Sequence, residues 1–168
     1  MITLKKVLVP TDFSETSKVA VKYARELASA YHGSVHVLHV LPDASNQPWA
    51  FGVETEVMGL STSEREKRWR ERADEQMKNL FSEAERKELN VQFATRVGNP
   101  VQQILQYATG QGVDLIVVGT TGRGTPPPET FGAFPRHSPI GSVAERVVRD
   151  APCPVLIVRH PEHEFVTP

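Results

Sequence analysis

The chain has 168 residues and a formal net charge of −1, with 39% hydrophobic and 23% charged residues, which suits one domain with one core. This composition gives no basic excess to attract nucleic acid or anionic lipid. The first apolar run, Val7 to Pro10, is too short for a signal peptide, and no run approaches the roughly 18 apolar residues of a membrane span. The single cysteine, Cys153, excludes an internal disulfide and fits a reducing compartment. We therefore expect a cytoplasmic protein that contacts neither membrane nor nucleic acid.

The first 41 residues predict a helix between two strands. The apolar run Lys6–Pro10 is the first strand, and either Ser14 or Asp12 can cap the helix that follows. An apolar stripe runs along this helix, which Gly33 can end: Ala20, Ala24, Leu27, Ala28 and Tyr31. Val35–Leu41 is rich in β-branched residues and predicts the second strand.

An irregular connection and a long helix are predicted next. Residues 42–60 contain several Pro and Gly residues, and Ser61–Glu64 then matches a capping box. The helix behind it is expected to continue through residues 64–88, with a charged face exposed to water. Its other face is apolar: Trp69, Ala73, Met77, Leu80, Phe81 and Ala84. Val91–Val97 is the third predicted strand.

The remaining sequence predicts two further helices, each followed by a strand. Asn99-Pro100 places Pro at the first helical position, and Gly110 and Gly112 stop that helix. Its buried stripe is Val101, Ile104, Leu105 and Ala108. The elements after it are a strong apolar strand, an irregular Gly- and Pro-rich segment, a helix and a last strand: Leu115–Val118, 119–141, Ser142–Val148 and Val155–Val158.

Strands and helices alternate along the whole chain, and the strands are almost continuously apolar. This pattern predicts an α/β fold, a doubly wound five-stranded parallel sheet with helices on both faces and strand order 3-2-1-4-5. Residues 1–160 form the expected domain, and 161–168 form a polar tail. The last strand lies at an edge, and an apolar edge invites pairing with another chain. We expect a two-fold homodimer in which this strand meets its copy antiparallel.

Ligands of such sheets bind outside the carboxyl ends of the strands. Three segments meet there, and a helix opens beside them: Pro10-Thr11-Asp12, His39-Val40-Leu41, Gly119-Thr120-Thr121-Gly122 and Gly141-Ser142. The Asp12 carboxylate can accept from ribose hydroxyls, and the Val40 backbone can bond an adenine edge. Gly119 and Gly122 let main-chain amides approach a phosphate, and the helix start at Ser142 adds N–H groups.

Each of these features also has a purely structural interpretation. Asp12 can be a helix cap, Val40 can be a core residue, and the two glycines can mark a turn. The Gly141-Ser142 pair can simply cap its helix. It is their joint position on one rim of the sheet that favours a binding site.

Several segments together resemble the universal stress protein family, in order over about residues 3–160. They are Val7–Ser14, Gly98-Asn99-Pro100, Asp114–Gly124, Gly141–Val148 and Pro152–Val158. The resemblance implies ATP or a related adenine nucleotide, Mg²⁺ with it, a homodimer and a role in stress survival. In nucleotide-binding members, the aspartate and valine hold the adenosine. A pattern of Gly, two residues, Gly, nine residues, Gly and Ser or Thr holds the phosphates.

The spacing in this chain departs from that pattern. Eighteen residues, 123–140, separate Gly122 from Gly141, and a count of nine ends at Gly132, which Ala133 follows. We therefore expect an insertion of about nine residues, either a lid with Arg123, Arg136 or His137 on the phosphates or an excursion that blocks the site. The resulting candidate set is Pro10, Thr11, Asp12, Val40, Gly119, Gly122, Arg123, Gly141, Ser142 and Val143.

Other chemistries are weaker. His36 and His39 point to opposite faces of a strand, so they and His32 do not form a metal site. The sequence has no Walker A motif, no G-x-S-x-G motif and no evident general base. We therefore assign no catalytic residue and expect at most slow ATP hydrolysis. The alternative is a dimeric interaction module of the same fold without nucleotide. Nucleotidyl transfer is the weakest hypothesis, because the His-x-Gly-His and Ser-Gly-Gly-x-Asp-Ser motifs are absent.

Overall fold

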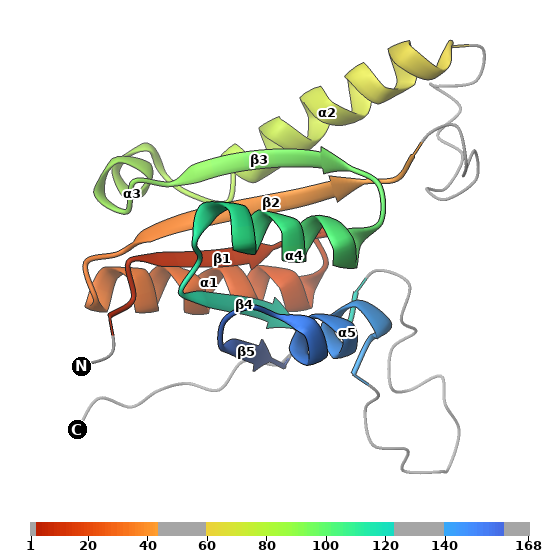
Figure 1. The fold of residues 1–168 in the computed structure, drawn as a ribbon. Coiled ribbons are helices and arrows are strands. Elements are labelled where there is room, and N and C mark those ends of the chain that lie inside the picture. Colours follow the sequence, from red (N-terminus) through yellow and green to blue (C-terminus); the bar gives the residue numbers. More distant parts are fainter. Residues whose placement is uncertain (1–2, 44–59, 123–139, 160–168) are drawn as a thin grey trace, which may run out of the picture.

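A computed structural model describes residues 3–43, 60–122 and 140–159. Five parallel strands form one sheet in the order β3-β2-β1-β4-β5, as predicted, with β1 at the centre and β5 at an edge (Figure 1). The strands are β1 Lys6–Pro10, β2 Ser34–Leu41, β3 Gln92–Val97, β4 Leu115–Gly119 and β5 Val155–Val158. Within the described ranges, no helix is long and apolar enough to cross a membrane.

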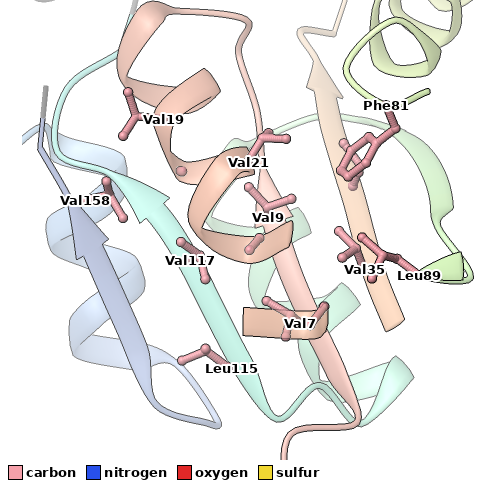
Figure 2. Close-up of a cluster of buried hydrophobic side chains, with 14 of the residues drawn as sticks. Val7, Val9, Val19, Val21, Val35, Phe81, Leu89, Leu115, Val117 and Val158 are labelled. Atoms are coloured by element: carbon pink, nitrogen blue, oxygen red, sulfur yellow. The ribbon is translucent and has the colours of Figure 1, made fainter. Parts of the chain in front are cut away.

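Helices cover both faces of the sheet, and this explains the continuous apolar strands. The helices are α1 Glu15–Ala30, α2 Thr62–Lys78, α3 Glu83–Glu88, α4 Pro100–Gln111 and α5 Ser142–Asp150. Val7 and Val9 of β1 pack with α1 and with Met77 of α2, in the cluster that Figure 2 shows. Leu8, between them, points the other way and packs with Ile104 of α4 and Val147 of α5. A strand that is buried on both faces needs apolar residues at consecutive positions.

The single long helix predicted over 64–88 is wrong, because the chain breaks between α2 and α3. Ser82 starts α3 with its own capping box to Glu85. Phe81 enters the core at the break, whereas Ala84 is exposed. Arg25 of α1 fixes the break, since its Nη2 donates to the Leu80 carbonyl at 2.7 Å and its guanidinium lies 5.0 Å from the centre of the Phe81 ring. The pattern Ser82-x-x-Glu85 was the missed signal.

The end of α1 also differs from the prediction. Tyr31 is the C-cap and is 53% exposed, so it does not belong to the buried stripe. The left-handed residue after the helix is His32, with φ of 53°, and not Gly33. Gly33 is needed for another reason, because a Cβ there would lie 2.5 Å from the Leu4 carbonyl oxygen. The glycine therefore permits close packing of two chain segments.

The end of α4 follows the prediction in part. Gly112 is the C-cap, with a left-handed φ of 60°, whereas Gly110 lies inside the helix. Tyr107 is buried and Leu105 only half-buried, so the buried stripe is rotated slightly from the expected one. Several predictions concern residues outside the described ranges: most of the 42–60 connection, Arg123 and the insertion, and the tail 161–168.

Candidate functional site

The carboxyl ends of the strands form one rim of the sheet (Figure 1). The predicted site residues that the structure describes lie near these ends or at the start of α5. β1 ends at Pro10, β2 at Leu41 and β4 at Gly119, while α1 and α5 begin at this rim. Two contacts show that segments far apart in sequence meet here. A Cβ on Gly122 would lie 2.6 Å from Asp12 Oδ2, and the Gly141 N–H donates to the Thr120 carbonyl at 2.6 Å.

The turn between β1 and α1 settles the question of the helix cap. Ser14 is the N-cap of α1, and its side chain accepts from the Ser17 N–H. Asp12 supports this cap: its Oδ1 accepts from the Ser14 N–H at 3.0 Å and from the Ser14 hydroxyl at 2.6 Å. The other carboxylate oxygen, Oδ2, faces Gly122. Asp12 is therefore not the cap, and one of its oxygens is directed across the rim.

Thr11 forms the inner wall of this turn. It is 5% exposed, and its N–H continues the β1–β2 pairing by donating to the Leu38 carbonyl at 2.9 Å. Its hydroxyl lies 3.1 Å from Ser17 Oγ and accepts from the Phe13 N–H at 3.0 Å. Pro10, the last residue of β1, is buried as well. Both residues shape the turn through their backbone and buried contacts.

The two glycines at the end of β4 and just after it are each needed for a different reason. A Cβ on Gly119 would lie 2.8 Å from Thr16 Cγ2, so this glycine lets the first turn of α1 pack on β4. Gly122 instead leaves room for the Asp12 carboxylate. Thr121, between them, lies 3.2 Å from the Thr16 hydroxyl, oxygen to oxygen. Gly122 borders the part of the rim that Asp12 faces, and Gly119 lies beneath it.

Among the residues that the structure describes, no side chain caps the start of α5. Its N-cap is Gly141, which makes no side-chain cap hydrogen bond, and a Cβ there would lie 3.1 Å from the Thr120 carbonyl oxygen. Ser142 is exposed, and Val143 is half-buried against the core formed with α4. Glu145 places a negative charge in the first turn, paired with Arg149 at 2.9 Å. First-turn N–H groups have no partner inside a helix, so this end can receive an anionic acceptor.

Val40 lies apart from the contacts that join the other site residues. It is half-buried near the end of β2 and packs toward the α4 side of the sheet. Its neighbour His39 faces the opposite side, and His39 Nδ1 lies 2.8 Å from the Thr11 carbonyl oxygen. His36 instead bonds the Tyr107 hydroxyl at 2.9 Å. Both histidines thus have protein hydrogen-bond partners. The described residues contain no cluster of three ligands for a metal ion.

The sequence interpretation missed the hydroxyl groups that hold this rim together. Thr16 and Ser17 are buried polar residues in the first turn of α1, and with Thr121 they link that turn to β1 and β4. The sequence shows two adjacent hydroxyl residues there but not their burial, because most Ser and Thr side chains are exposed. Arg123 lies outside the described residues, so the site is seen without it.

Comparison with known proteins identifies the family. The Universal stress protein family matches residues 3–159. Universal stress protein MJ0531 of Methanocaldococcus jannaschii is 33% identical over 160 residues, 95% of this chain and 85% of the relative. MJ0577 of the same organism is 31% identical over 165 residues, 94% of this chain and 96% of the relative. A solved structure of MJ0577 has a TM-score of 0.71 at 28% identity and covers 96% of this chain and 100% of that one.

Two more distant structures share the fold alone. One is a universal stress protein in complex with cAMP, with a TM-score of 0.53 at 23% identity, covering 93% of this chain and 97% of that one. The other is an Archaeoglobus fulgidus universal stress protein in complex with dAMP, with a TM-score of 0.51 at 19% identity, covering 94% of this chain and 98% of that one. From the match over nearly its whole length, the chain belongs to the universal stress protein family.

Proposed function

We propose that this protein binds an adenine nucleotide, ATP in the first instance, at the carboxyl ends of its strands, and acts as a regulatory protein in a stress response. The observation that carries the proposal is the meeting of Asp12, Gly122 and Gly141 on one rim. There, a carboxylate oxygen faces Gly122, and the segment that contains Gly122 also contacts the uncapped start of α5. Family members of the same fold form complexes with cAMP and dAMP, which supports an adenine nucleotide as the ligand class.

Each group in the proposed site has a chemical task. Asp12 accepts from the ribose hydroxyls, and the Val40 backbone bonds the adenine edge. The N–H groups near Gly122 and at the start of α5, with the Ser142 hydroxyl, receive the phosphates. Pro10, Thr11, Gly119 and Val143 shape the walls, and Arg123 is the proposed cationic contact. Mg²⁺ would arrive with the nucleotide, since this ion is commonly held by phosphates and water with few protein ligands.

The proposed activity is binding and signalling, with at most slow hydrolysis. Asp12, the one carboxylate in the proposed set, is engaged with Ser14 and assigned to the ribose, so it is not assigned as a base for water. Residues 1–160 form the proposed nucleotide-binding domain, followed by the polar tail 161–168. The single cysteine of the sequence agrees with a reducing compartment such as the cytoplasm.

Calorimetry with a series of ligands tests the proposal. ATP, AMP, adenosine, GTP and tripolyphosphate are titrated into the protein with Mg²⁺ present. The proposal expects one site per chain, tightest binding for ATP, measurable binding for adenosine and weaker binding for GTP. Equal affinity for ATP and GTP would contradict adenine recognition. No binding of any ligand would leave the interaction module as the function to pursue.

We also propose a homodimer through β5, whose edge supports either function. Val155, Leu156 and Ile157 are half-buried on this edge strand, and the nearby Val148 of α5 is 46% exposed. An apolar strand edge pairs readily with a second copy. Replacing Ile157 by Lys is expected to give monomer or aggregate in sedimentation equilibrium, with Gln92→Lys in β3, at the opposite edge of the sheet, as the control. A dimer of unchanged affinity in Ile157→Lys would contradict the proposed interface.

A further inference from the structure

β2 carries two buried histidines of similar exposure on opposite faces of the sheet. His36 is 5% exposed and His39 is 7% exposed. His36 Nδ1 lies 2.9 Å from the Tyr107 hydroxyl on the α4 side. His39 Nδ1 lies 2.8 Å from the Thr11 carbonyl oxygen in the β1–α1 turn. Because a carbonyl only accepts, His39 must carry its proton on Nδ1 and donate it to Thr11.

The orientation of the Thr11 carbonyl affects the conformation of the residue that follows it, Asp12. The carbonyl belongs to the planar peptide unit that leads into Asp12, so fixing this oxygen also fixes the positions of the Asp12 N and Cα atoms, from which the carboxylate side chain extends. Residue 13 follows in a left-handed conformation, with φ of 63°. A non-glycine residue is disfavoured in this region, so the conformation persists only where contacts hold it.

His39 also contacts the residue on the far side of Asp12. The ring centroids of His39 and Phe13 are 4.6 Å apart, with the planes inclined by 37°. The buried His39 side chain therefore contacts the turn at Thr11 and at Phe13, on either side of Asp12. Inside the turn, the Phe13 N–H donates to Thr11 Oγ1 at 3.0 Å and the Ser14 N–H donates to Asp12 Oδ1 at 3.0 Å.

We propose that His39 is a positioning residue of the nucleotide site, which holds the Asp12 carboxylate toward Gly122 through the Thr11 carbonyl and the Phe13 ring. This inference rests on the proposed function, because positioning Asp12 matters for affinity only if Asp12 binds the nucleotide. His39 acts on the affinity for the adenosine part of the ligand without touching the ligand. His36, on the same strand, serves as a matched control because its partner lies in α4.

The first measurement is calorimetry with AMP on variants of the two histidines. His39→Leu removes the donor and is expected to weaken AMP binding about tenfold. His39→Asn restores an N–H near the position of Nδ1 and recovers most of the affinity. His39→Gln places its amide farther out, near the position of Nε2, and does not. His36→Leu destabilises the fold but leaves AMP affinity within about twofold of the wild type.

The second measurement is amide hydrogen exchange of Phe13 and Ser14 by NMR, without nucleotide. His39→Leu is expected to speed both exchanges about tenfold, and His36→Leu leaves them unchanged after correction for global stability. If the wild type binds no nucleotide, the proposed function fails and the exchange rates alone decide the role of His39. If His39→Leu matches His36→Leu in exchange, or His39→Asn rescues nothing, the inference is overturned even when the wild type binds.

Discussion

The helices α1 and α5 both begin at the carboxyl ends of the strands, yet their first turns are completed differently. At α1, Ser14 caps the helix and Asp12 supports Ser14, so side chains satisfy the turn from within. At α5, Gly141 stands at the cap and makes no side-chain cap bond. The other described helices, α2, α3 and α4, are capped by side chains as α1 is. At the start of α1, side chains thus accept hydrogen bonds from the N–H groups of Ser14 and of the first turn. At the start of α5, the N-cap residue offers no side chain to do so.

Under the proposed function, this difference assigns two parts of the nucleotide to the two halves of the rim, at the starts of α1 and α5. Where side chains fix each other, as around Asp12, a site can discriminate between hydroxyl patterns such as those of ribose. Where the N-cap is a glycine, as at α5, the N–H groups of the first helical turn after it can bind any group with phosphate-like charge and shape. Substitutions in the two halves should therefore affect different parts of the nucleotide.

The largest expected effect is that of Gly141→Val. Because a Cβ at Gly141 would lie 3.1 Å from the Thr120 carbonyl oxygen, a valine forces that backbone to shift and crowds the start of α5. We expect ATP affinity to fall about 100-fold or more, with adenosine affinity nearly unchanged. Calorimetry with both ligands measures this.

Two control variants accompany that substitution. Gly110→Val adds the same bulk within α4, where a Cβ meets nothing within 4 Å, and should leave ATP binding intact. Gly132→Val tests the other candidate for the phosphate glycine, which lies outside the described residues. If Gly132→Val abolishes ATP binding and Gly141→Val does not, the assignment of the phosphate-binding half is wrong.

The next effect, Asp12→Ala, acts on the other half. A charge-assisted pair with the ribose contributes roughly 1.5–3 kcal/mol, so affinity for ATP and for adenosine should fall together by about tenfold to hundredfold. Tripolyphosphate binding should remain as in the wild type. Calorimetry and thermal melting are run on the same variant, and intact binding with a clear loss of stability would return Asp12 to a purely structural role.

A smaller effect is expected from Ser14→Ala, which distinguishes loss of a helix cap from loss of ligand affinity. Ser14→Ala removes the α1 cap and should cost about 1 kcal/mol of unfolding free energy, and adenosine affinity should fall severalfold because Ser14 also holds Asp12 Oδ1. Ser61→Ala removes the α2 cap at a comparable cost in stability and should leave affinity unchanged. Urea unfolding and calorimetry measure both quantities. Equal affinities in the two variants would contradict the coupling between cap and ligand.

The smallest expected effect is the pH dependence of the unfolding free energy caused by His36, which lies outside both halves of the rim. Burial, and to a lesser degree the charge of Lys6, lowers the pKa of His36 from its usual 6.5. The unfolded chain therefore binds a proton near pH 6.5 that the folded protein resists, so the unfolding free energy should fall as pH drops below about 6.5, by less than about 1.4 kcal/mol per pH unit.

Removing this titration tests its origin. Urea unfolding between pH 5 and 8, the interval in which histidine titrates, should show a flatter acid limb in His36→Leu than in the wild type. An identical slope in both proteins would place the titration elsewhere. AMP affinity in the two proteins should agree within about twofold at neutral pH, because His36 faces α4 and not the rim.

The sheet could be predicted from the sequence, whereas the details of the rim could not. Apolar runs such as Leu115–Val118 identify strands buried on both faces, and this pattern is visible without coordinates. The break before Ser82 was missed because Leu80 and Phe81 fit the helical period, although a second capping box was present. The period reports which residues are apolar, not whether the backbone continues.

The cap of α1 shows the limit more clearly. Asp12 and Ser14 are both cap-forming residue types, and only the observed hydrogen bonds distinguish the cap from its support. The bond from His39 joins two segments 28 positions apart through a backbone carbonyl, which leaves no trace in residue identity. Such contacts depend on the register of β1 and β2, and so on the assembled sheet.

The most direct test of the two-part site is amide NMR of the protein titrated with adenosine and then with ATP. Adenosine should shift the amides of Asp12, Ser14 and Val40, and ATP should shift in addition those of Gly122 and Ser142. That stepwise pattern is the predicted result. Saturating ATP that shifts none of these amides, or that shifts only residues far from the rim such as those of α2, would contradict the account.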